Sequence, residues 1–120
     1  MTEAKNSKQY DLEERTLRFA KEVIELVNTL PKTMVNIEIM KQIIRSSGSV
    51  GANYIEANEA LSKKDFTLRV KICRKEAKES RYWLRLIEVR GEEVEKIMQS
   101  LINEATELMK IFGSIVEKVK

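Results

Sequence analysis

The sequence contains no histidine and only one cysteine, Cys73, among its 120 residues. No disulfide can therefore form within the chain, and zinc, haem and histidine-dependent catalytic sites lack their usual ligands. No apolar stretch approaches the roughly 20 residues that cross a bilayer, and the first ten residues are polar. These absences lead us to expect a cytoplasmic protein with no metal or other cofactor, no small-molecule substrate and no membrane partner.

Proline and glycine are also scarce, with one proline, Pro31, and four glycines. Such a chain has few places to turn, and its 34% of charged residues, rich in Glu, Lys and Arg, favours long solvent-exposed helices. A length of 120 residues with 42% hydrophobic content suits one packed core. We therefore predict an all-α protein with a single domain over residues 1–120.

Apolar and small residues recur with alternating steps of three and four, the period of a helix that packs in a left-handed bundle. The steps predict helices at about residues 11–30, 36–61, 64–90 and 92–118. The buried positions expected from this spacing are Leu12, Thr16, Phe19, Val23, Leu26 and Leu30, then Met40, Ile43, Ser47, Val50, Tyr54, Ala57 and Leu61, then Phe66, Val70, Cys73, Ala77, Ser80, Leu84 and Ile87, then Val94, Met98, Leu101, Ala105, Leu108, Phe112, Ile115 and Val119. Ala20, Ile24 and Val27 would widen the first of these stripes. Four such stripes predict an up-down antiparallel four-helix bundle.

The segment R-S-S-G-S-V-G, residues 45–51, has the composition of a flexible linker. The second stripe nevertheless crosses it without losing phase, which favours a continuous helix. We predict that Gly48 and Gly51 allow close backbone approach at a narrow layer built from Val50, Ala77 and Ala105. A kink between the two glycines is the alternative.

Three residues suit helix ends. Asn36 is a candidate N-cap of the second helix, and Ser62, with Asp65 three positions later, is a candidate N-cap of the third. Gly91 suits a left-handed C-cap of the third helix.

Positive charge is concentrated in residues 63–90, which contain ten Lys or Arg residues and only four Asp or Glu residues. Six of the cations share one stripe with steps of three, four or seven: Lys64, Lys71, Arg74, Lys78, Arg81 and Arg85. A row of cations matches the phosphate backbone of RNA or DNA. The other interpretation is a solvated face, or one paired with acids of the second helix, with Glu56 near Lys71 and Glu59 near Lys64.

The third helix carries more large apolar residues than one buried stripe requires: Leu68, Ile72, Tyr82, Trp83 and Leu86. Together with Ile39, Ile44 and Ile55 of the second helix they could form a subunit interface, where Tyr and Trp are enriched. A wider intramolecular core would hide some of them equally well.

Three segments in combination resemble a known family: S-G-S-V-G-A-N-Y-I-E-A (residues 47–57), K-D-F (64–66) and K-E-A-K-E-S-R-Y-W-L-R-L-I (75–87). The chain resembles the ribosomal RNA intervening-sequence proteins, also called the four-helix bundle protein family. The resemblance covers nearly the whole chain and implies an up-down four-helix bundle assembled as a homopentameric ring. Some members are encoded inside insertions in bacterial large-subunit ribosomal RNA genes. The fold also resembles the accessory protein of diversity-generating retroelements, a strongly basic pentamer that binds nucleic acid and a reverse transcriptase, whereas the formal net charge here is only +3.

The residues that match the family motif are Asn53, Glu56, Glu76, Glu79, Tyr82 and Trp83. Carboxylate di-metal bundles use Glu-x-x-His pairs, which a chain without histidine cannot supply. We expect Glu76 and Glu79 to pair with Arg45, and Cys73 to act as a small buried hydrophobe. The sequence therefore predicts a protein that is not an enzyme. It is either an oligomer that binds nucleic acid or a scaffold for protein interactions.

Overall fold

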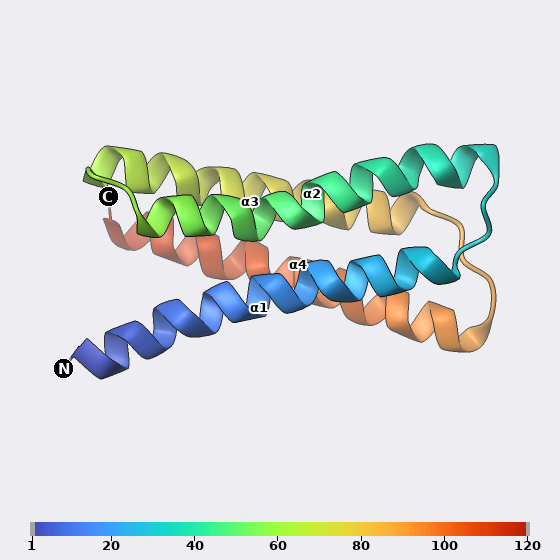
Figure 1. Ribbon diagram of the computed structural model, residues 1–120, viewed down its shortest axis with the longest axis horizontal. Coiled ribbons are helices and arrows are strands. Elements are labelled where there is room, and N and C mark those ends of the chain that lie inside the picture. The colour runs from blue at the N-terminus through green and yellow to red at the C-terminus, as the bar shows by residue number, and fades with distance from the viewer. Residues whose placement is uncertain (1, 120) are drawn as a thin grey trace.

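The computed structural model describes residues 2–119, and the side chains of residues 11–119. Over this range the chain forms four helices and no strand: α1 (Thr2–Thr29), α2 (Met34–Asn58), α3 (Lys63–Leu86) and α4 (Glu92–Val119). Each helix runs antiparallel to the one before it, in a bundle of 47 × 24 × 19 Å (Figure 1). The all-α prediction is confirmed. None of the described helices is long and apolar enough to cross a membrane.

The core follows the predicted stripes, with Phe19, Ile43, Leu84 and Phe112 among its completely buried side chains. Several predicted positions are less buried than expected: Ala20, Phe66, Val94, Ile115 and Val119 are half-buried, and Ile24 and Leu61 are exposed. Leu61 is fully exposed because α2 ends at Asn58 and leaves this residue in the connection to α3. In α4 it is Val116, not Ile115, that is buried, since four residues after Phe112 the helix has turned back to the core. Ile24 is 47% exposed rather than part of the core.

Several predicted helix ends differ from the structure. Helix α1 begins at Thr2 and not near residue 11, and α2 ends at Asn58 and not near residue 61. The N-cap of α2 is Thr33, whose side chain accepts from the Asn36 backbone N–H at 3.1 Å. Asn36 is buried instead, and its side-chain amide donates to the carbonyls of Pro31 and Glu88, joining two connections at one end of the bundle. Helix α3 ends at Leu86 and not near residue 90, because Ile87 turns into extended backbone and is buried in the core.

Of the two caps predicted for α3, the N-cap Ser62 is confirmed and the C-cap Gly91 is wrong. Ser62 caps α3 as expected, with its side chain accepting from the Asp65 backbone N–H at 3.0 Å. Gly91 does have a positive φ, of 101°, but it lies in the connection directly before α4 and does not cap α3. A left-handed backbone was therefore predicted correctly and assigned to the wrong helix end.

Helix α2 is continuous through residues 45–51, as the phase of its stripe predicted. The hydroxyls of Ser46, Ser47 and Ser49 donate to carbonyls in the preceding turn, which satisfies them inside the helix. A Cβ at Gly51 would lie 2.9 Å from the Thr16 Oγ1, so glycine allows α1 and α2 to approach. Gly48 has no neighbour within 4 Å of such a Cβ, so its predicted packing role is wrong.

The seam between α1 and α4 is the most loosely packed of the four. Two adjoining surface grooves of about 470 Å³ each run along it. Arg15 bridges the seam with two hydrogen bonds to the Glu104 carboxylate, at 2.7 and 2.9 Å. The hydrogen bonds with Glu104 raise the pKa of the Arg15 guanidinium above its ordinary value, because they stabilise its charged form.

Candidate nucleic-acid interface

The six cations of the basic stripe lie along the side of α3 that faces α4. Arg81 donates to the Thr106 hydroxyl of α4 at 3.3 Å, and the stem of Arg74 lies over Gly113 of α4, 3.7 Å from where a Cβ would be. Arg81 is half-buried by this contact. The other five are exposed to solvent: Lys64, Lys71, Arg74, Lys78 and Arg85.

None of these six cations forms an ion pair in the part of the chain whose side chains are described. The expected pairs of Glu56 with Lys71 and of Glu59 with Lys64 do not form. The reason is geometric, because α2 packs against one side of α3 and the stripe lies on the other, towards α4. The groups of α4 that contact the stripe are the Thr106 hydroxyl and Gly113, and neither carries a charge. The positive charge is therefore not neutralised by a neighbouring helix.

One further cation extends this surface. Lys110 lies one turn after Thr106 on α4, and its only ion pair is an exposed contact with Glu107 at 3.7 Å. Pairs of this kind contribute little and leave the ammonium accessible. Spacing along the sequence could not reveal Lys110, because it is isolated on a helix with a net negative composition. Only the packing of α4 against α3 places it on the same side as the stripe.

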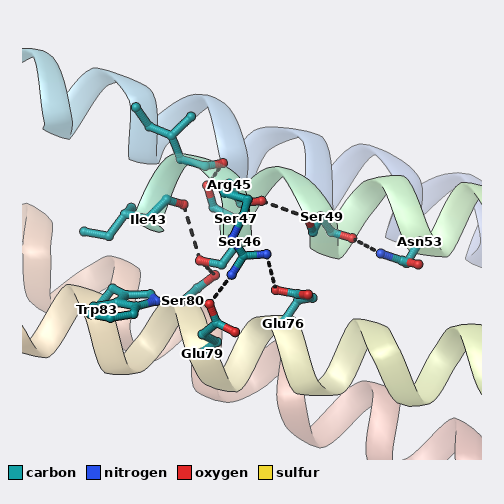
Figure 2. A network of polar contacts seen from close by, with 11 residues as sticks. Ile43, Arg45, Ser46, Ser47, Ser49, Asn53, Glu76, Glu79, Ser80 and Trp83 are labelled. Carbon is teal, nitrogen blue, oxygen red and sulfur yellow. Dashed lines mark hydrogen bonds and ion pairs between the residues drawn. The ribbon is translucent and has the colours of Figure 1, made fainter. Parts of the chain in front are cut away.

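The opposite side of α3 carries a polar network with α2, shown in Figure 2. Arg45 of α2 donates to the Glu76 carboxylate at 3.3 Å and pairs with Glu79, as expected from the sequence. Glu79 also accepts from the Trp83 indole N–H at 3.1 Å. Glu76 is only 8% exposed, so Arg45 compensates a carboxylate that the fold has largely removed from water.

Two more hydrogen bonds join the same helices. The hydroxyls of Ser80 and Ser46 are 2.8 Å apart inside the core, and Arg69 donates to the Asn53 side-chain carbonyl at 3.2 Å. Ser46, the neighbour of the predicted buried position Ser47, is therefore the serine that bonds to Ser80. Three of the family-motif residues thus bond across α2 and α3: Asn53, Glu76 and Glu79. Trp83 contributes from within α3, by donating to Glu79.

Removal of Arg45 tests this structural role. We expect Arg45→Ala to lower the free energy of unfolding by about 1 to 2 kcal/mol, because Glu76 loses its partner in a poorly hydrated position. Urea unfolding followed by circular dichroism measures the change.

The matched control is Lys41→Ala, which removes the exposed pair of Lys41 with Glu38, 3.1 Å apart and also on α2. Its expected cost is below about 0.5 kcal/mol. Equal effects of the two substitutions would show that the Arg45 network contributes no more than a surface pair.

No group of three or more His, Cys, Asp or Glu side chains in the described part of the chain has the geometry to hold a metal ion. Cys73 is buried in the core as predicted, and burial raises the pKa of its thiol to about 12, so little thiolate exists at neutral pH.

The apolar residues predicted for a subunit interface divide into two groups. Leu68, Tyr82 and Leu86 are exposed, whereas Ile72 is half-buried and Trp83 packs against the core. Tyr82 contacts the Trp83 ring edge-on, with ring centroids 5.1 Å apart. On α2, Ile44 and Ile55 are exposed but Ile39 belongs to the core, so it is not available to a partner.

Residues 8–114 match the family described as 23S rRNA-intervening sequence protein. This chain belongs to that family. Membership agrees with the resemblance of residues 47–57 and 75–87, and the structure explains part of that motif as the polar contact between α2 and α3 of the intervening-sequence fold.

One solved structure of the same kind is similar over most of its length. It is a protein of unknown function from the S23 ribosomal protein family of Bacteroides thetaiotaomicron, 35% identical, with a TM-score of 0.76. The similarity covers 88% of this intervening-sequence protein and 97% of the Bacteroides chain. No curated protein matches the sequence.

Proposed function

We propose that this intervening-sequence protein is a non-enzymatic, cytoplasmic oligomer that binds the phosphate backbone of RNA or DNA. The observation that carries the proposal is the stripe on α3, in which six cations lie in one row and none has an acidic partner. A charged row without partners keeps its full potential for an external polyanion. The description of the family, which refers to ribosomal RNA, favours RNA over DNA.

The dimensions of the stripe suit a nucleic-acid backbone. From Lys64 to Arg85 the helix rises by about 32 Å, close to the length of one duplex turn. Lys and Arg bind phosphates by charge and hydrogen bonds, and each neutralised phosphate releases counterions. Tyr82 is exposed four residues after Lys78, but we assign its ring to the proposed subunit contact, so we expect weak sequence preference.

Self-association is part of the proposal. Exposed apolar side chains such as Leu68, Tyr82 and Leu86 favour a partner surface, and the family resemblance favours a closed ring of five subunits. A ring would present several basic stripes to one polyanion, and multivalency would strengthen the weak contact that each subunit makes.

The second candidate function is a protein-interaction scaffold that binds no nucleic acid. The same exposed apolar side chains favour it, since they suit any protein partner. The two functions differ in their response to salt, because only phosphate binding should weaken steeply with ionic strength.

Fluorescence anisotropy with a labelled RNA hairpin, a scrambled hairpin and a DNA duplex tests the proposal. If about four phosphates are neutralised, affinity for RNA should fall about 50-fold between 50 and 200 mM salt, with little difference between the two hairpins. Absence of binding at 50 mM salt, or binding that is insensitive to salt, would contradict the proposal and favour the scaffold.

A further inference from the structure

The largest group of exposed apolar side chains lies on the outer surface of α1 and α2. We call it the α1/α2 face, and its members are between 38% and 51% exposed: Leu17, Ile24, Ile37, Ile44 and Ile55. Two contacts place the adjoining flanks of these helices side by side. Gly51 faces Thr16 across the seam, and Asn58 donates to the Glu13 carboxylate at 2.7 Å. Leu17 and Ile24 flank the α1 side of this seam.

A second apolar strip lies on α3. We call it the α3 ridge, and it contains Leu68, Ile72, Tyr82 and Leu86 with steps that follow the helical period. Leu68 and Leu86 each lie nine residues from the fully buried Ala77, which places them on the opposite side of the helix from the core. The ridge and the α1/α2 face therefore lie on different sides of the bundle and cannot contact each other within one chain.

The two surfaces have matching heights along the bundle. The hydrogen bond between Ser46 and Ser80 places Tyr82 at the level of Ile44, and the contact of Gly51 with Thr16 places Ile24 near the same level. The bond between Asn53 and Arg69 likewise places Leu68 near Ile55. Leu86 and Ile37 follow at the end of the bundle where α1 connects to α2.

Lys75, the polar residue within the ridge, also has a matching position on the α1/α2 face. Lys75 interrupts the ridge between Ile72 and Tyr82, at the level where the α1/α2 face has Gly48. Gly48 has open space around it, which leaves room for the long Lys75 side chain of another copy. At the opposite end the exposed Lys64 and Lys71 lie beside Leu68, and the exposed Glu59 lies beside Ile55. A contact between the two surfaces would therefore pair these two cations of the stripe with an acid of the next subunit and leave the other four cations for phosphate.

We infer that the α3 ridge of one subunit packs against the α1/α2 face of the next subunit, with the bundles parallel and in register. This inference rests on the self-association proposed above and assigns its surfaces. Because the two surfaces differ, the contact is heterologous, and repeating it with a fixed rotation gives a ring. The basic stripe lies between the ridge and α4, so its α4-facing cations, Arg74 and Arg81, stay outside this contact.

Disulfide cross-linking tests the assignment. The double variant Ile44→Cys/Tyr82→Cys is oxidised under mild conditions and analysed by denaturing, non-reducing electrophoresis, alongside each single variant. Native Cys73 does not interfere because it is buried and its thiol pKa is raised to about 12. We expect a ladder of covalent oligomers from the double variant that disappears on reduction, and only monomer from each single variant.

Ile97→Cys/Tyr82→Cys is the matched control, since Ile97 is 47% exposed but lies at the groove between α1 and α4. It should give no ladder. A covalent dimer from Tyr82→Cys alone would indicate a symmetric ridge-to-ridge contact and overturn the inference.

Light scattering of the wild-type protein separates the remaining outcomes. An oligomer without cross-links in the double variant would mean that self-association stands but uses other surfaces. A 13.9 kDa monomer at micromolar concentration would contradict self-association and the inference together. Phosphate binding is measured separately by anisotropy, and a monomer that binds RNA would retain the basic stripe while losing the multivalency proposed above.

Discussion

Simultaneous replacement of Arg74, Lys78 and Arg81 by alanine is expected to abolish most of the salt dependence of RNA binding. If each side chain neutralises one phosphate of a single strand, the slope of log affinity against log salt should become less negative by about 2. Affinity at 50 mM salt should fall by at least about tenfold, since contacts with phosphates are strongest at low ionic strength. Anisotropy titrations at several salt concentrations measure both quantities.

The matched control removes three exposed lysines from elsewhere in the chain: Lys21, Lys32 and Lys96. It changes the net charge by the same amount and should leave the slope nearly unchanged. Helicity and oligomer size should match wild type in both triple variants. If both variants lose affinity equally, binding responds to overall charge and the stripe is not the site.

Substitution of Gly51 by valine is expected to cause the largest loss of stability. A Cβ at this position would lie 2.9 Å from the Thr16 Oγ1 and 3.3 Å from the Thr16 Cβ. Thr16 is buried, and its hydroxyl donates to the carbonyls of Leu12 and Glu13, so it cannot move aside freely. We expect Gly51→Val to lower the free energy of unfolding by about 2 to 3 kcal/mol, measured by urea unfolding.

Gly113→Val is the control, because it makes the same exchange within a helix. Its Cβ would meet only the Arg74 side chain at an ordinary 3.7 Å, so stability should stay within about 0.5 kcal/mol of wild type. Thr16→Ala should recover part of the loss when combined with Gly51→Val, since it removes the closest atom. A Gly51→Val midpoint equal to that of Gly113→Val would show that α1 and α2 do not depend on this close approach.

The sequence by itself determined the four helices and the phase of their buried stripes. Burial of one helix side is a local property that repeats along the chain, so it can be followed through Gly48 and Gly51 even where the composition suggests a linker. The same reasoning located the basic stripe and the pairing of Arg45 with Glu76 and Glu79. All of these predictions depend on spacing within a helix or on the register of two adjacent helices.

Helix ends were decided by tertiary contacts. Ile87 leaves α3 and is buried in the core, although it continues the apolar period of its helix. Asn36 is recruited by the Pro31 and Glu88 carbonyls, while Thr33 caps the helix. A periodic pattern cannot show where leaving the helix lowers the free energy of the fold, because the groups that make the new contacts lie in distant segments of the chain.

Only the tertiary structure decided which neighbour each flank of a helix meets. Spacing shows how far Lys71 lies from the core stripe of α3, but not that this flank faces α4 and is therefore out of reach of Glu56. The same limitation made Ile24 look like a core residue, whereas the packing of α1 leaves it exposed beside Ile44. The reason is that a helical period fixes the angle of a side chain relative to its own axis. Which residues of other helices lie next to that side chain depends on how all four helices are arranged.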